Sequence, residues 1–243
     1  MNEFAGSLAG RFIVIDGPDG AGKTTQLRSL REYLTALGCR VAVVIDPGTT
    51  KIGQKIRSLL LDRDNGEIGP MCETLLFMAS RAQLVYERVR PALEQGKVVL
   101  CDRFVTATIA YQGASGVDHG TILKLAEIAI EGTWPDLTLI LNLPVKEGFN
   151  RLGVDRARLK RPQDEEMQRI SGPKKRSQAG PRQLFLFGDR MESRSSNFHR
   201  RVVEIFKELH SYYPGKVRYV DGVGTEEEVF SRLTAELAKE FSP

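Results

Sequence analysis

The chain is poor in cysteine and lacks long apolar runs. Its 243 residues include three cysteines, Cys39, Cys72 and Cys101, which are too far apart in sequence to indicate a disulfide framework or a zinc-ligand spacing. No stretch approaches the roughly 18 consecutive apolar residues of a membrane-spanning helix. Residues 1–10 lack the basic start and apolar core of a secretory signal. We therefore expect buried free thiols, no zinc, no membrane span and a cytoplasmic protein.

Basic residues are concentrated in one segment of the chain. The net charge is +4, but residues 151–201 hold 14 Arg or Lys against 6 Asp or Glu, so the rest of the chain is net negative. Residues 153–188 are also rich in glycine and end in the apolar patch 184–187. This segment is compatible with a lid over polyphosphate, a nucleic-acid-binding patch or a solvated surface loop.

Short apolar runs alternate with longer segments of helical periodicity. The runs are 12–15, 41–45, 98–101, 137–143 and 217–220, and the expected helices are 23–37, 52–61, 72–94, 121–131, 192–210 and 225–241. This alternation predicts a single α/β domain over residues 1–243, a three-layer sandwich whose parallel sheet of about five strands has helices on both faces. Polar residues directly follow three runs, so we expect them to share one crevice: Asp16, Asp46, Asp102 and Arg103.

A glycine-rich motif follows the first apolar run. Residues 17–24 read GPDGAGKT, which satisfies the pattern GxxxxGK[ST] between an expected strand and an expected helix. In this motif, glycines turn backbone N–H groups toward phosphate oxygens, Lys23 reaches the outer phosphates and the Thr24 hydroxyl suits magnesium. The motif predicts an ATP site, and with such a site in the chain the lid becomes the favoured interpretation of the basic segment.

Four further stretches carry a family resemblance. They are DPGTTKIGQKIRSLLL from Asp46, LLFMASRAQL from Leu75, CDRFVTATIAYQG from Cys101 and DRMESRSSNFHRRV from Asp189. Together with the motif they resemble the thymidylate kinases of bacterial type, over nearly the whole chain from Arg11. The resemblance implies a P-loop NTPase fold of the nucleoside monophosphate kinase kind. It also implies ATP- and Mg²⁺-dependent phosphorylation of dTMP to dTDP and a homodimer. We expect neither a membrane nor a nucleic acid as a partner.

The resemblance also assigns residues to the ATP side of the reaction. Lys23, Asp102 and Arg103 match catalytic positions. Thr24 and Asp102 match positions that bind magnesium either directly or through a water molecule. Lid arginines, above all Arg156 and Arg190 with Arg158 and Arg161 as further candidates, would stabilise transition-state charge. The segment 151–190 would be an enlarged lid. The implied ATP contacts are Gly17, Pro18, Asp19, Gly20, Ala21, Gly22, Lys23, Thr24, Thr25 and Arg151, the last against adenine.

On the dTMP side, the resemblance implies a hydrogen bond from the sugar 3′-hydroxyl to Asp19 and a grip on the acceptor phosphate by Arg103. Phe77 and Arg81 are four residues apart, so they share one side of a helix. In the family, this aromatic residue stacks on thymine and the arginine addresses a base carbonyl. Tyr111 would crowd a ribose 2′-hydroxyl, whereas Gln112 could donate or accept at the base edge.

The chain departs from the bacterial pattern at two places. Ile45 stands where the family has an arginine that contacts the acceptor phosphate, so Lys51, Arg57 or a lid arginine would have to substitute. The interval from Arg151 to Asp189 spans 38 positions, far more than the family's lid. Two alternatives therefore stay open: a kinase for another pyrimidine monophosphate such as dUMP, and a nucleotide-binding module without turnover.

Overall fold

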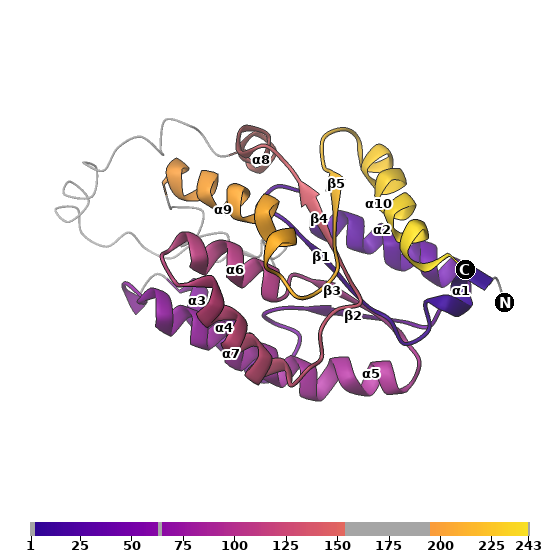
Figure 1. Cartoon of the computed structure of the whole chain (residues 1–243), viewed down its shortest axis with the longest axis horizontal. Helices are drawn as coiled ribbons and strands as arrows, with labels where there is room; N and C mark the ends of the chain where they lie inside the picture. Colours follow the sequence, from indigo (N-terminus) through magenta and orange to yellow (C-terminus); the bar gives the residue numbers. More distant parts are fainter. Residues whose placement is uncertain (1–2, 63–64, 154–194, 243) are drawn as a thin grey trace, which may run out of the picture.

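The computed structural model describes residues 3–62, 65–153 and 195–242, and within them five parallel strands form one sheet. The sheet order is β2-β3-β1-β4-β5, and every neighbouring pair is parallel. The predicted parallel sheet of about five strands is therefore confirmed (Figure 1). The strands are β1 (Phe12–Asp16), β2 (Val41–Ile45), β3 (Val98–Asp102), β4 (Leu137–Asn142) and β5 (Val217–Asp221).

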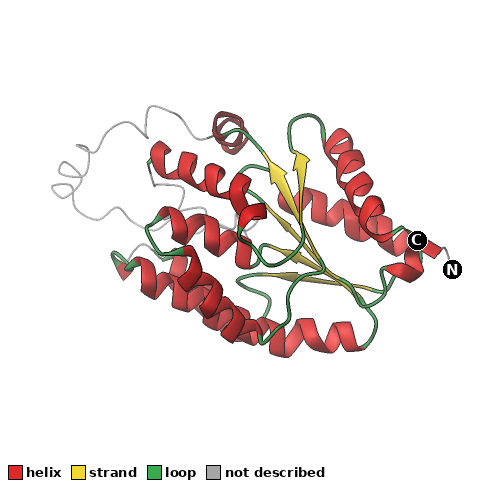
Figure 2. Cartoon of the chain, viewed as in Figure 1, coloured by secondary structure: helices red, strands yellow, loops and turns green. Residues whose placement is uncertain are grey.

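Helices cover both faces of the sheet (Figure 2). On one face, α1 (Glu3–Ser7), α2 (Lys23–Ala36) and α10 (Glu226–Phe241) bury their apolar side chains against Ile13 and Ile15 of β1. On the other face, Phe12 and Val14 join a second core. Because alternate residues of β1 face opposite cores, the whole strand is buried. The helices of this second face are α4 (Pro70–Leu84), α5 (Arg90–Glu94), α6 (Val105–Ala114), α7 (His119–Ile130) and α9 (Ser196–Glu208).

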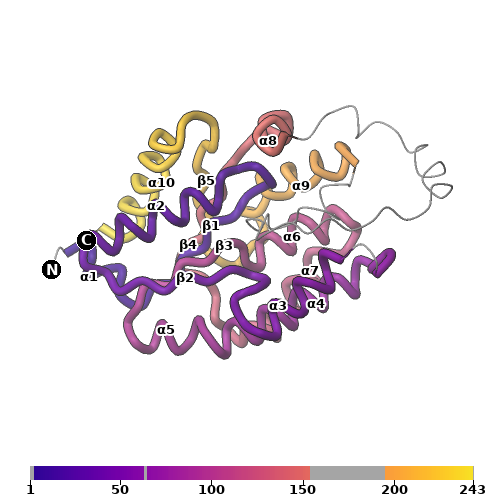
Figure 3. The backbone as a smooth tube through the Cα atoms, turned by 180° about the vertical axis from the view of Figure 1, so that it is seen from behind, coloured from indigo at the N-terminus to yellow at the C-terminus, as the bar shows by residue number. Residues whose placement is uncertain are grey.

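Shorter elements complete the described parts. α3 (Lys51–Leu61) packs on α4, α8 (Val145–Leu152) follows β4, and η5 (Leu209–Ser211) ends α9. Figures 1 and 3, taken from opposite sides, both place α3, α4 and α7 along one flank and α2 with α10 along the other.

The helix expected over 72–94 is interrupted. α4 ends at Leu84, a π-helical segment η2 (Val85–Val89) follows, and α5 begins at Arg90. Pro91 lies in the first turn of α5 and has no backbone N–H to donate to the carbonyl four residues earlier. The proline therefore accounts for the change of hydrogen-bond pattern.

Sequence periodicity did not predict α6 or α8. Every residue of α6 is buried, so the helix has no polar face and no 3.6-residue alternation to detect. α8 has eight residues and is too short for a clear periodic signal. The omission of α6 matters for function because this helix carries Tyr111 and Gln112.

Candidate active site

The glycine-rich loop joins β1 to α2 and leaves no room for side chains at two of its glycines. A Cβ on Gly17 would lie 2.5 Å from the Leu141 carbonyl oxygen, and one on Gly20 would lie 2.5 Å from the Gly148 carbonyl oxygen. Both glycines also have positive φ angles, 140° and 77°. The loop thus lies directly against the end of β4 and α8. Its backbone N–H groups, with the N-terminus of α2, form a binding place for an anion.

Lys23 is buried at the start of α2. Its Nζ donates to the Pro18 carbonyl oxygen at 2.8 Å, which holds the side chain along the loop. Burial and the nearby Arg103 guanidinium lower the pKa of Lys23 to about 8, although Asp19 and other carboxylates oppose this shift. An anion bound at the loop would supply the negative charge that favours the protonated amine.

Thr24 and Asp102 form a small oxygen-rich site. The Thr24 hydroxyl donates to Asp102 Oδ2 at 2.9 Å, which joins α2 to the end of β3. Asp102 Oδ1 is buried and accepts no hydrogen bond from the residues that the structure describes. Such an oxygen is costly to bury unless a ligand satisfies it. A hydroxyl and a carboxylate fit Mg²⁺, which takes few protein ligands and completes its shell with water and phosphate.

Arg103 is buried next to the glycine-rich loop and contacts residues on both sides of it. Its side chain is 1 % exposed, and Nη2 donates to Asp19 Oδ1 at 2.5 Å. Nη1 donates to the Gly17 carbonyl oxygen at 3.1 Å and to Asp16 Oδ1 at 3.3 Å. The guanidinium also lies 5.1 Å from the centre of the Tyr111 ring. The backbone of Arg103 has φ of 66°, a strained value for a residue with a side chain, so these contacts hold it in place.

The pKa values of the two carboxylates beside Arg103 are shifted in opposite directions. Burial raises the pKa of Asp16, more than Arg103 and the Thr106 hydroxyl lower it. Burial also opposes ionisation of Asp19, but Arg103 and Lys23 outweigh it and hold the pKa of Asp19 below its ordinary value. Asp19 is therefore a carboxylate at neutral pH and can accept a hydrogen bond from a ligand.

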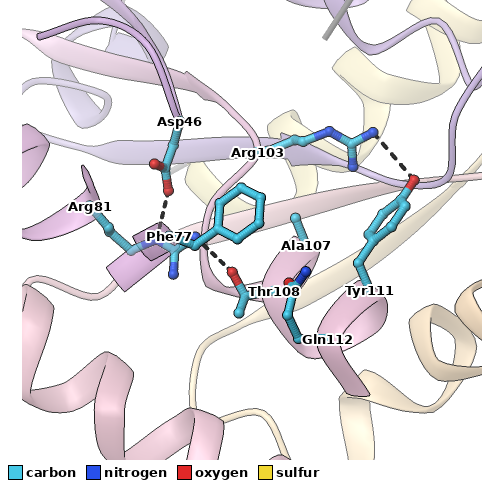
Figure 4. A pocket seen from close by; sticks show the side chains of 8 residues that line it. All are labelled: Asp46, Phe77, Arg81, Arg103, Ala107, Thr108, Tyr111 and Gln112. Atoms are coloured by element: carbon cyan, nitrogen blue, oxygen red, sulfur yellow. Dashed lines mark hydrogen bonds and ion pairs between the residues drawn. The ribbon is translucent and has the colours of Figure 1, made fainter. Parts of the chain in front are cut away.

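A second pocket lies beyond Arg103 (Figure 4). Phe77 and Arg81 of α4 line one side, and α6 lines the other. This arrangement brings together five of the residues that the family resemblance assigns to the acceptor. The lining is Asp46, Phe77, Arg81, Arg103, Ala107, Thr108, Tyr111 and Gln112.

Arg81 is held from several directions within this pocket. Nε donates to Asp46 Oδ2 at 2.6 Å, and Nη2 donates to the Phe104 carbonyl oxygen at 2.9 Å and to Thr108 at 3.0 Å. Nη1 contacts Met78 Sδ at 3.2 Å. Since a guanidinium has five N–H groups, the described residues leave one N–H on Nη1 for a ligand. Sequence reasoning placed Asp46 in the shared crevice but did not predict that it orients Arg81.

An open cleft lies on the other side of the loop. Gly20, Gly22 and Thr25 line it together with Arg151, and the family resemblance assigns all four residues to ATP. Arg151 Nη2 donates to the Gly222 carbonyl oxygen at 3.0 Å, so the arginine is tied to the loop before α10. That loop was not predicted as part of the site, because no motif marks it.

The remaining predicted residues divide into two groups. Arg156, Arg158, Arg161 and Arg190 lie outside the described residues. Arg57 and Lys51, the substitutes considered for the missing arginine at Ile45, are placed: Lys51 is exposed, whereas Arg57 is buried and donates from Nη1 to the Pro47 carbonyl oxygen at 3.0 Å. Its Nε and Nη2 have no partner in the described parts of the chain.

The position of the loop defines the class of protein. A phosphate-binding loop between the first strand and helix of a parallel sheet, with Asp102 and Arg103 at the end of the adjacent strand, is the arrangement of a P-loop nucleoside monophosphate kinase. The family model of thymidylate kinase matches residues 15–179, more than half of the chain. The chain therefore belongs to the thymidylate kinase family.

Individual relatives agree with this assignment over almost the full length. The chain is 39% identical over 229 residues to the thymidylate kinase of Pelobacter propionicus, which covers 94% of each protein. It is 40% identical over 227 residues to that of Geotalea uraniireducens, covering 93% of this chain and 95% of the relative. The thymidylate kinase of Thermoanaerobacter sp. is 36% identical over 217 residues, covering 89% and 91%.

Proposed function

We propose that the protein transfers the γ-phosphoryl group of ATP to dTMP and produces dTDP. The observation that carries the proposal is the direct contact of two subsites: Arg103, which lines the pocket with Phe77 and Arg81, donates to Asp19 of the phosphate-binding loop. Phosphoryl transfer requires donor and acceptor in line with their charges neutralised, and it requires little covalent chemistry from the protein. Two nucleotide subsites joined by buried cations meet this requirement.

The donor side of the proposed reaction uses the loop and its flanking residues. Backbone N–H groups and Lys23 hold the outer phosphates of ATP. Thr24 and Asp102 would hold Mg²⁺, which neutralises phosphate charge in this class of reaction. Arg151 and the cleft beside Thr25 take the nucleoside of ATP.

The acceptor side uses the second pocket. Arg103 gives up part of its hydrogen bonding to Asp19 and donates instead to the 5′-phosphate of dTMP. Asp19 then accepts a hydrogen bond from the sugar 3′-hydroxyl. Phe77 supplies an apolar face for the base, and the remaining N–H of Arg81 donates to a base carbonyl. The Tyr111 ring, fixed against Arg103, restricts the space available to a ribose 2′-hydroxyl.

Arg57 substitutes for the arginine that the family has at the position of Ile45. It lies on α3 rather than on β2 and is buried. Two of its nitrogens have no hydrogen-bond partner among the described residues. Burial lowers the pKa of Arg57, while Asp102 raises it and Arg103 lowers it, so the guanidinium lies within the electrostatic reach of the proposed phosphate site. A bound phosphate would satisfy the two nitrogens.

The same proposal covers the arrangement of the chain. Residues 1–243 act as one kinase domain, in which 151–190 is the lid that brings Arg156 or Arg190 to the transferred group and excludes water. No helix among the described residues is long and apolar enough to cross a membrane. We place the enzyme in the cytoplasm because its proposed substrates, ATP and dTMP, are found there.

A homodimer is the proposed assembly. α3, α4 and α7 pack in series along one flank of the molecule, and each carries exposed large apolar side chains. Ile52 and Leu59 of α3 are seven residues apart, and Met71 and Leu75 of α4 are four apart, so each pair shares one side of its helix. Together with Ile128 of α7 they form apolar surface that a second copy could cover.

The direct test is ADP release by the purified full chain with ATP and Mg²⁺. The acceptors dTMP, dUMP, UMP, dCMP, dGMP and AMP are supplied separately. The proposal requires dTMP to give the highest kcat/KM, with UMP rejected by Tyr111. Turnover confined to another monophosphate would change the substrate, and ATP binding without turnover on any acceptor would leave a nucleotide-binding module.

The lowered pKa of Lys23 predicts that ATP binding takes up protons above neutral pH. At pH 8 roughly half of the free enzyme has a neutral Lys23, and bound phosphate raises the pKa again, so binding takes up about half a proton per site. The affinity for ATP accordingly falls as the pH rises above 8. Isothermal titration in two buffers of different ionisation enthalpy measures the uptake, and Lys23→Met should abolish it. Equal apparent enthalpies in both buffers at pH 8 would contradict the assignment.

A further inference from the structure

One buried hydrogen bond determines which end of the Gln112 amide faces the acceptor pocket. Gln112 Nε2 on α6 donates to Glu73 Oε2 on α4 at 2.9 Å, and both residues are 1 % exposed. The carboxylate oxygen of Glu73 accepts this hydrogen bond, so the NH₂ end of the amide is turned toward Glu73. Among the residues that the structure describes, none donates to Gln112 Oε1. The carbonyl end of this amide is therefore available to the pocket that Gln112 lines.

Arg81 and Gln112 then present a fixed donor and a fixed acceptor to one ligand. Both residues line the pocket with Phe77, and Figure 4 shows Arg81 and Gln112 on either side of Thr108. Thymine and uracil carry a carbonyl acceptor at O4 beside a donor at N3. Cytosine carries the opposite pattern, an amino donor beside an acceptor at N3. A fixed pair of this kind matches the first pattern and opposes both groups of the second.

We propose that Glu73 is a positioning residue that sets base specificity: it holds Gln112 so that Oε1 accepts from N3–H of the base and rejects cytosine. The inference rests on the proposed function and deepens it. An amide by itself is ambivalent, because rotation by 180° exchanges its donor and its acceptor. Rotation of Gln112 would place Oε1 against the Glu73 carboxylate, so two acceptors would meet where both side chains are buried.

The decisive variant is Glu73→Gln, which keeps the size of the side chain and its ability to pair with Gln112. It removes only the direction of that pair, because two amides can bond in either of two orientations. We expect the ratio of kcat/KM for dUMP to kcat/KM for dCMP to fall by about tenfold or more. If dCMP turns over too slowly, its Kd from isothermal titration replaces kcat/KM.

Two further variants separate specificity from stability. The interchange Glu73→Gln/Gln112→Glu again offers the base an acceptor alone, so the ratio should return toward that of the wild type. Thr74→Val is the matched control: Thr74 is buried next to Glu73 and donates to the Pro70 carbonyl oxygen at 2.8 Å. Loss of this hydrogen bond should lower the melting temperature and leave the ratio of kcat/KM for dUMP to kcat/KM for dCMP unchanged.

The outcomes distinguish the inference from the proposed function. Wild-type enzyme without turnover of dTMP refutes the proposed function. Wild-type enzyme active on dTMP, with an unchanged ratio in a folded Glu73→Gln, makes Glu73 a structural residue and overturns the inference. If Glu73→Gln does not fold, Gln112→Met is tested instead, because it keeps a similar side-chain size and removes the acceptor. A fall of at least about tenfold in the ratio of kcat/KM for dUMP to kcat/KM for dCMP supports the fixed acceptor, and an unchanged ratio overturns it.

Discussion

Lys23→Ala should lower kcat by about a hundredfold to a thousandfold while the fold persists. Lys23 is the cation that the loop aims at the outer phosphates, and it is the one lysine of residues 17–24. Removing it costs the hydrogen bond to the Pro18 carbonyl oxygen, about 1 kcal/mol. It also removes a buried charge whose pKa is lowered to about 8, which offsets that loss. Steady-state kinetics and a thermal melt measure the two effects.

The control for this variant is Lys124→Ala, which removes an exposed lysine of α7 away from the loop. It should leave kcat and the melting temperature unchanged. Turnover of Lys23→Ala at the wild-type rate would refute the role of Lys23 in phosphoryl transfer. A melting temperature far below that of the wild type would show instead that the loop depends on Lys23 for its conformation.

Arg103→Ala should damage both activity and stability. The change leaves Asp16 and Asp19 buried without their shared cation, and breaking a buried ion pair costs about 3 kcal/mol of unfolding free energy. Loss of the acceptor-phosphate grip should lower kcat/KM for dTMP by about a thousandfold or more. Denaturant unfolding measures the free energy, and initial rates at varied dTMP measure kcat/KM.

Arg103→Lys separates these two effects. It keeps a positive charge beside the carboxylates but loses the fork that binds two oxygens, so it should retain more stability than Arg103→Ala while KM for dTMP still rises. Arg90→Ala is the matched control, because Arg90 pairs with Glu131 at 2.7 Å on a part of the molecule that lines neither pocket. If Arg103→Ala unfolds more easily but keeps the wild-type kcat/KM, Arg103 is only a structural residue.

The sequence predicted the loop and the sheet well because their signals are local. The glycine spacing of residues 17–24 and the apolar runs of the strands each lie within a few consecutive residues, and the structure confirms the parallel sheet and the polar residues at its carboxyl edge. The signal failed for α6, where burial on all sides removes periodicity. It also failed for the helix over 72–94, which Pro91 interrupts with a π-helical segment. The expected burial of the three thiols was wrong for two of them, because Cys39 is half-buried and Cys72 is exposed, and only Cys101 is buried.

By itself the sequence determined the phosphate-binding loop, the α/β class and the family, because each depends on the order and spacing of nearby residues. Only the tertiary structure decided how the acceptor pocket is tuned. Asp46 fixes Arg81 from 35 positions away, and Glu73 fixes Gln112 from 39 positions away. Such pairs leave no trace in local spacing, since their partners meet only when separate helices and strands pack together. The choice between donor and acceptor at Gln112 is therefore a property of the fold.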